Sequence, residues 1–314
     1  MSGLELARGY FERFGRPMLE KEFPALLPYL AAGFVGSGSE RFGFDDEISR
    51  DHDFEPGFCL FLPAEEIIDR RSAFLLERAY SRLPAEYCGI RRQRFCPVGG
   101  ARNGVLRTAD FYTAAVGSPD GMLTVDEWLT VPDEALAEAV NGEVFLDNYG
   151  EFTRIRSRLL AMPEDIRLKR LAGNLLLMGQ AGQYNFTRCL RHGETEAAQL
   201  ACNEFVNAAL KVYFLLDRKY KPYYKWSFRA LRQLEGGAET AEKLSLLLMT
   251  DHRDSSAAGR KVDVIEELAS DLSDRLRAEE QTGQPGNELV AHAYAVNEQI
   301  RDGMLRTRHI LAAV

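Results

Sequence analysis

The pattern of apolar residues changes near residue 150, and this change constrains the fold more than any other feature of the chain. Before it, short apolar runs bounded by Gly or Pro alternate with helical stretches, which is typical of an α/β arrangement. After it, apolar residues recur with the 3.6-residue period of amphipathic helices almost throughout. We therefore expect an α+β protein with two domains: an α/β domain with a small mixed sheet at residues 1–150 and a helical bundle at residues 151–314.

The first half predicts three strands with a helix between two of them. The helix is expected over residues 64–83, where charged and apolar positions follow a helical period. The strands are expected at residues 31–36, 58–63 and 103–108.

The second half predicts about five or six helices. Phe205, Ala209, Val212 and Leu216 lie on one face of a helix, and two later stretches repeat such a stripe. Gly, Pro and capping residues indicate where helices stop or start. These breaks are expected at residues 162–165, 191–196, 219–224, 235–239 and 282–286.

Composition limits the class of partner. The formal net charge is −8, which argues against nucleic acid as the main partner and favours a small molecule. Five cysteines without C-x-x-C spacing indicate neither a disulfide framework nor a zinc site. No apolar run approaches the roughly 20 residues that span a bilayer, and charges interrupt the N-terminal apolar positions. We expect a cytoplasmic protein with no membrane contact.

The segment after the first predicted strand is rich in small residues and carboxylates. It contains two Gly-Ser pairs, Gly36-Ser37 and Gly38-Ser39. Small residues at a turn allow backbone N–H groups to approach an anion closely, so this segment is a candidate seat for phosphates.

Two aspartates follow, Asp51 and Asp53, separated by one residue. Alternate side chains of a strand point to the same face, so both carboxylates can reach one site. Hard oxygen ligands of this kind suit Mg²⁺ shared with substrate phosphates. His52 is expected to point away from them, and residues 45–47 are expected to form an exposed acidic turn.

Gly38-Ser39-x(11)-Asp51-x-Asp53 resembles the signature of the polymerase-beta-like nucleotidyltransferases, the superfamily that includes the aminoglycoside and lincosamide nucleotidyltransferases. Residues 126–129, 141–159 and 218–231 also resemble an uncharacterised bacterial family, known as a domain of unknown function, with this catalytic core. The resemblance covers roughly residues 30 to 235. The sequence departs from the pattern because Gly36-Ser37 duplicates the Gly-Ser step, so either pair is a candidate for the phosphate seat.

The resemblance implies that Asp51 and Asp53 bind two Mg²⁺ ions and that a third carboxylate on a later strand completes the metal site. Asp110 is the first choice for this residue, although Asp favours helix N-caps and could cap the helix that follows. Asp126 and Glu127 are rivals, and the alternative for them is the start of an amphipathic helix packed through Trp128 and Leu129.

The resemblance also implies a nucleoside triphosphate substrate, ATP as first choice, and transfer of its nucleoside monophosphate to a hydroxyl of a small-molecule acceptor. Lys225 is a candidate to contact the triphosphate, with an exposed structural lysine as the alternative. The aromatic residues Tyr184, Tyr223, Tyr224 and Trp226 are candidates to line the acceptor pocket or to form ordinary core. A second hypothesis is a nucleotide-binding regulatory or antitoxin-like interaction protein that performs no transfer.

Overall fold

The computed structural model describes residues 1–49, 54–92 and 103–314. The chain packs into two compact units. Unit 1 comprises Met1–Leu123 and Glu134–Ala161, and unit 2 comprises Thr124–Asp133 and Met162–Val314. The expected α+β class is confirmed, because helices predominate and a small mixed sheet of four strands is present.

The sheet lies in unit 1 and has the order β5-β2-β1-β6. Strand β2 is parallel to β5, whereas β1 is antiparallel to both β2 and β6. Three of the strands lie within the predicted ranges, and the fourth, β6, was not predicted. Their bounds are Ala31–Phe34 for β1, Cys59–Leu62 for β2, Gly104–Arg107 for β5 and Glu143–Asp147 for β6.

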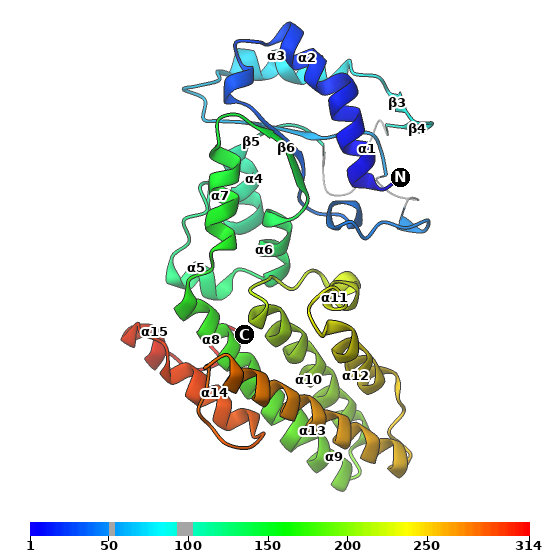
Figure 1. Cartoon of the computed structure of the whole chain (residues 1–314), viewed down its shortest axis with the longest axis vertical. Coiled ribbons are helices and arrows are strands. Elements are labelled where there is room, and N and C mark those ends of the chain that lie inside the picture. The colour runs from blue at the N-terminus through cyan, green and yellow to red at the C-terminus, as the bar shows by residue number, and fades with distance from the viewer. Residues whose placement is uncertain (50–53, 93–102) are drawn as a thin grey trace. The chain divides into compact units, whose positions relative to one another are not determined.

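Helices cover both faces of this sheet (Figure 1). On one face lie α1 (Gly3–Tyr10), a π-helical turn (Phe11–Gly15), α2 (Arg16–Glu22) and α3 (Arg70–Ser81). On the other lie α4 (Thr108–Val116) and α7 (Glu151–Leu160), and α6 (Asp133–Val140) leads back towards β6. Two short strands, β3 (Glu86–Tyr87) and β4 (Ile90–Arg91), form a separate hairpin.

Helix α3 starts later than the sequence predicted. Its N-cap is Asp69, whose carboxylate accepts a hydrogen bond from the backbone N–H of Ser72 at 2.7 Å. An N-cap carboxylate of this kind fixes where a helix begins. The predicted helical residues before Asp69 therefore lie outside α3, and residues 65–67 form a turn.

The core of unit 1 is aromatic. Tyr10, Phe11 and Phe58 are fully buried between the sheet and the N-terminal helices. The Tyr80 hydroxyl donates to the carbonyl of Phe58 at 2.8 Å, and burial raises the pKa of Tyr80 well above its usual range. Full burial of one large apolar side chain contributes about 1.5–3 kcal/mol, so this cluster holds the N-terminal helices on the sheet.

Unit 2 is built from helices around α8 (Glu164–Met178), which packs against α10 (Thr195–Leu216) and α14 (Leu289–Glu298). Four of the five predicted breaks contain a helix boundary, and the fifth, 282–286, lies within a longer connection between residues 278 and 289. Further breaks at residues 250–254 and 299–302 were not predicted, so the helices outnumber the five or six expected. The bounds are α5 Val125–Thr130, a π-helical stretch Gly179–Phe186, α9 Thr187–Arg191, α10 Thr195–Leu216, α11 Tyr224–Leu231, α12 Gly237–Met249, α13 Ser255–Ala278, α14 Leu289–Glu298 and α15 Gly303–Thr307.

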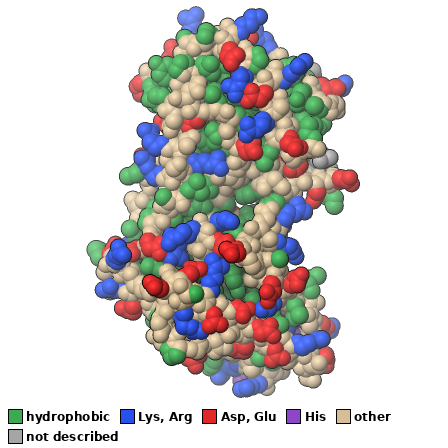
Figure 2. Space-filling view, in the orientation of Figure 1, with side chains coloured by type: hydrophobic (Ala, Val, Ile, Leu, Met, Phe, Trp, Pro, Cys, Tyr) green, Lys and Arg blue, Asp and Glu red, His purple; other side chains and the backbone are tan. Residues whose placement is uncertain are grey.

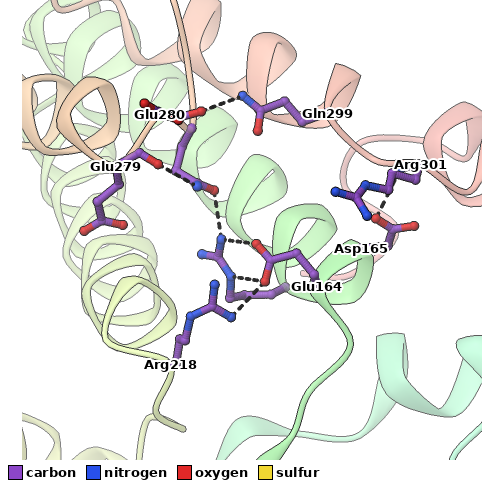
Figure 3. Close-up of polar contacts among 9 residues, drawn as sticks. Glu164, Asp165, Arg218, Glu279, Glu280, Gln299 and Arg301 are labelled. Carbon is purple, nitrogen blue, oxygen red and sulfur yellow. Dashed lines mark hydrogen bonds and ion pairs between the residues drawn. The ribbon is translucent and has the colours of Figure 1, made fainter.

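A polar network surrounds the first turn of α8 (Figure 3). Glu164 accepts hydrogen bonds from Arg167 at 2.6 Å and from Arg218 at 2.8 Å. These bonds, that of Arg167 first, lower the pKa of Glu164 to about 2. The adjacent Asp165 accepts the backbone N–H groups of Arg301 and Asp302. The network therefore joins the start of α8 to connections that are distant in sequence.

The surface of unit 2 mixes charges of both signs. Figure 2 shows Lys and Arg side chains interspersed with Asp and Glu side chains over its visible face. In the described part of the chain, no helix has both the length and the apolar character needed to cross a membrane.

Candidate functional site

Four strand ends meet at one edge of the sheet in unit 1. Gly33 of β1 lies opposite Cys59 of β2, which lies opposite Gly104 of β5, while Phe34 lies opposite Glu143 of β6. The carboxyl end of β1 therefore lies beside the amino ends of the other three strands. Both Gly-Ser pairs follow β1 directly, so we call this edge the Gly-Ser edge.

The turn formed by residues 36–39 requires glycine at two positions. Gly36 has φ +104° and Gly38 has φ +125°, values that residues with a side chain rarely adopt. A Cβ at Gly38 would also lie 2.3 Å from a carboxylate oxygen of Glu40. The backbone of this turn, which we call the Gly-Ser turn, is thus specific to glycine.

Asn141 holds the turn from the side of β6. Its Oδ1 accepts the Gly36 N–H at 2.8 Å, and its Nδ2 donates to the Gly36 carbonyl at 2.7 Å. Gly142 follows, and a Cβ there would lie 2.0 Å from the carbonyl oxygen of Phe34. The Asn-Gly pair before β6 therefore fits closely against the end of β1.

Arg41 also holds the turn, through its buried guanidinium group. Its side chain is buried, pairs with Glu40 at 2.6 Å and donates to the carbonyl of Ser37 at 2.7 Å. It also donates to Asn103 at 3.0 Å, and its guanidinium lies 4.3 Å from the ring centroid of Phe34. A buried charge needs such partners, and here they connect the turn to the start of β5.

The Gly-Ser turn presents backbone donors. Among residues 1–49, 54–92 and 103–314, the amides of Ser37, Gly38 and Ser39 donate to no partner. Ser37 is exposed, and Gly38 and Ser39 are half-buried. Backbone N–H groups seek an acceptor, and successive ones in a fixed turn suit an anion.

The predicted metal ligands Asp51 and Asp53, with His52 between them, lie outside the described residues. The described chain continues from Phe54 and enters β2 at Cys59, at the Gly-Ser edge. In the parts of the chain on either side of the two gaps, no group of three or more His, Cys, Asp or Glu side chains is placed to hold a metal.

Asp110 follows the carboxyl end of β5, whereas the Gly-Ser edge holds the amino end of β5. Because β5 is parallel to β2, α4 begins beyond the opposite edge of the sheet, and Asp110 lies exposed in its first turn. Asp110 is not the N-cap either, since Arg107 has that position. The neighbouring Phe111 ring instead reaches towards the turn, 3.5 Å from where a Cβ of Gly36 would lie.

The rivals of Asp110 have local roles in unit 2. The Glu127 carboxylate accepts the N–H of Thr124 at 2.7 Å, and the Thr124 hydroxyl accepts the N–H of Glu127, which forms a capping box for α5. Asp126 forms an ion pair with Arg308. Trp128 and Leu129 are buried, so the alternative of an amphipathic helix is confirmed.

The acidic residues 45–47 also have a local role. Asp46 accepts the N–H groups of Ile48 and Ser49 at 3.1 and 3.0 Å, and Asp46 and Glu47 are exposed. Asp45 accepts the N–H of Gly3 at 3.0 Å. This segment is an acidic turn, as the sequence predicted.

Lys225 and most of the predicted aromatic residues lie together in unit 2. Lys225 is exposed in the first turn of α11. The rings of Tyr223 and Tyr224 lie 4.3 Å apart, and Trp226 lies 6.0 Å from Tyr223. Tyr184 is separate, because it lies in the π-helical stretch before α9 and the 22-residue helix α10 separates that stretch from α11. The Tyr184 hydroxyl instead accepts a hydrogen bond from Arg188 at 2.9 Å.

Comparison with known proteins gives one partial match. Residues 128–227 match the model of a family described as a domain of unknown function (DUF4037). The match covers about a third of the chain and includes Asn141 and Lys225, but neither the Gly-Ser turn nor the Asp51–Asp53 segment. No curated protein matches the chain, and no solved structure does.

Sequence reasoning missed the residues that hold the turn. Asn141, Arg41 and Asn103 act through hydrogen bonds to positions up to 105 residues away, which no local pattern reports. One signal was present: Asn141-Gly142 before an apolar run is a common start of a strand after a turn. It predicts a strand, although it does not identify the strand's neighbour.

Proposed function

We propose that the protein is a Mg²⁺-dependent nucleotidyltransferase that moves a nucleoside monophosphate, AMP from ATP as first choice, to a hydroxyl of a small-molecule acceptor. One observation carries the proposal. The Gly-Ser turn is held by hydrogen bonds from Asn141 and Arg41 and presents the amides of Ser37, Gly38 and Ser39 at the edge where the chain enters β2, six residues after Asp53 in sequence.

In this proposal the turn and the two aspartates act on the same triphosphate. The amides of residues 37–39 bind its oxygens, with Ser39 as the closer match to the nucleotidyltransferase pattern. Asp51 and Asp53 would hold Mg²⁺, which when bound would neutralise charge on the triphosphate and on the leaving pyrophosphate. The acceptor oxygen forms a bond to the α-phosphorus as the bond to pyrophosphate breaks.

The acceptor must also lose a proton. Asp110 is the sequence-based candidate for the third carboxylate, and Glu55 is a second candidate because it lies at the Gly-Ser edge. Its carboxylate is 3.4 Å from Nδ2 of Asn103, the residue before β5. Measuring kcat for Glu55→Gln and Asp110→Asn distinguishes the two candidates, because only loss of the residue that accepts the proton should lower kcat.

The proposal is tested by release of pyrophosphate from ATP with Mg²⁺ and a panel of hydroxyl-bearing acceptors. Asp51→Asn and Asp53→Asn should each abolish release and leave the melting temperature unchanged, because each substitution removes one negative ligand and opens no core cavity. Asp46→Asn is the matched control, with the same change of charge in the exposed acidic turn and full activity expected.

Two outcomes decide against the proposal. Release that continues in both Asp51→Asn and Asp53→Asn contradicts the metal site. Tight binding of Mg²⁺–ATP without pyrophosphate release under any condition favours the nucleotide-binding regulatory protein instead.

A further inference from the structure

We infer that Asn141 is the positioning residue of the Gly-Ser turn: it sets the orientation in which the turn presents its amides to a triphosphate. The inference rests on the proposed function and extends it to a residue 105 positions away in sequence from the turn it holds. Asn141 acts through Gly36 and does not itself need to contact the nucleotide.

The geometry is that of a two-point clamp. The side-chain amide of Asn141 accepts from Gly36 N–H at 2.8 Å and donates to Gly36 C=O at 2.7 Å. These two bonds fix the peptide groups on both sides of Gly36. Glycine is the residue with the most conformational freedom, so without the clamp the turn samples other backbone conformations.

Only an asparagine supplies this pair of bonds from the same position. An aspartate has no donor for the carbonyl, and a leucine of similar size has neither group. Asn141 is half-buried, and the strand that follows it pairs Glu143 with Phe34, so its backbone is fixed by the sheet. The sheet therefore determines where the clamp lies, and the clamp determines the turn.

A second asparagine provides the comparison that separates positioning from stability. Asn148 follows β6 at the opposite edge of the sheet, where its Nδ2 donates to the carbonyl of Leu27 at 2.9 Å. Both residues are asparagines next to the same strand that bond the backbone of an earlier segment. Only Asn141 contacts the Gly-Ser turn.

The experiment uses the full chain and compares Asn141→Leu and Asn141→Ala with Asn148→Leu and Asn148→Ala. Binding of Mg²⁺–ATP and of inorganic triphosphate is measured by calorimetry, KM and kcat by pyrophosphate release, and stability by thermal melting. We expect both Asn141 variants to raise the Kd for inorganic triphosphate and the KM for ATP about tenfold, with a smaller change in kcat. The Asn148 variants should keep wild-type KM and Kd whatever their melting temperatures.

The inference is overturned if the Asn141 variants bind triphosphate as the wild type does, or if the Asn148 variants lose affinity to the same extent. A wild-type chain that neither binds Mg²⁺–ATP nor releases pyrophosphate overturns the proposed function and this inference with it. Hydrogen exchange checks the mechanism: the Gly36 amide should exchange faster in both Asn141 variants than in either Asn148 variant. Equal exchange contradicts the clamp.

Discussion

The Gly-Ser edge of unit 1 and helix α8 of unit 2 both bury polar side chains, but they use them differently. In α8, the buried side chains of Lys169 and Arg170 donate hydrogen bonds to carbonyl and carboxylate oxygens. At the Gly-Ser edge, the side chains of Arg41 and Asn141 hold a backbone turn in which the amides of Ser37, Gly38 and Ser39 donate to no described partner. The buried polar side chains of α8 stabilise the fold, whereas we propose that those at the Gly-Ser edge shape a binding site for a ligand.

Helix α8 shows the structural use most clearly. Lys169 is fully buried and donates to Asn297 at 2.9 Å and to the carbonyls of Arg306 and Arg308 at 3.3 and 2.7 Å. Burial lowers its pKa, and these three acceptors offset part of the cost. Lys169 thereby ties the C-terminal segment to the central helix.

We expect the greatest loss of stability on replacing Arg170. Its side chain pairs with Asp133 at 2.5 Å and donates to the carbonyls of Trp128 and Val131, with only 5% of the side chain exposed. Arg170→Met leaves a buried carboxylate unpaired, so we expect the unfolding free energy to fall by about 3–5 kcal/mol in urea titrations.

The control for this prediction is Arg16→Met, which removes an exposed ion pair with Glu12 on the surface of unit 1. Exposed pairs contribute less than about 1 kcal/mol, so its unfolding should be nearly unchanged. A loss at Arg170 no larger than that at Arg16 would contradict the structural role assigned to the buried cations of unit 2.

A smaller, pH-dependent effect is expected at Glu164. Hydrogen bonds from Arg167 and Arg218 lower its pKa to about 2, and 45% of the side chain is exposed. The contribution of a carboxylate with a lowered pKa is present above its unfolded value of 4.5 and is lost as the pH falls towards 2. Since solvent screens this partly exposed group, we expect Glu164→Gln to cost about 1 kcal/mol at pH 7.

The measurement is urea unfolding of wild type and Glu164→Gln at a series of pH values. The difference between the two proteins should shrink steadily below pH 4.5. A difference that stays constant down to pH 3 would mean that the ion pairs do not produce it.

The smallest stability effect, with a selective effect on ligand, is expected at the serines of the turn. Ser39→Ala should weaken Mg²⁺–ATP binding more than Ser37→Ala, because the interval from Ser39 to Asp51 fits the nucleotidyltransferase pattern. Neither serine side chain makes a hydrogen bond with the described residues, so melting temperatures should change little. Calorimetric titration decides the order, and the reverse order assigns the phosphate seat to Gly36-Ser37.

Local patterns predicted part of the secondary structure, but they gave neither the N-terminal helices α1 and α2 nor the neighbours of each strand. The three strands at short apolar runs bounded by Gly or Pro were found, whereas β6, whose five residues begin and end with acidic side chains, was missed. The predicted boundary at residue 150 falls between β6 and α7, two elements that pack in the same unit. Helix α7 belongs there because Phe152 lies against Phe61 of β2, with ring centroids 4.3 Å apart.

The candidate site followed the same rule. The Gly-Ser pairs predicted the turn, because a backbone with positive φ requires glycine, which is visible in the local sequence. Strand direction has none, so the sequence suggested Asp110 although β5 runs parallel to β2 and carries it away from the Gly-Ser edge. Partners distant in sequence, such as Asn141 for Gly36, become visible only once the strand order is known.

The proposed site is tested most directly by a crystal structure of the full chain with Mg²⁺ and a non-hydrolysable ATP analogue whose α,β-bridging oxygen is replaced by a methylene group. We predict that the triphosphate lies on the amides of Ser37, Gly38 and Ser39, with Asp51 and Asp53 binding the metal beside the α-phosphate. A nucleotide bound elsewhere in the chain, with these amides and both aspartates making no contact to it, would contradict the account.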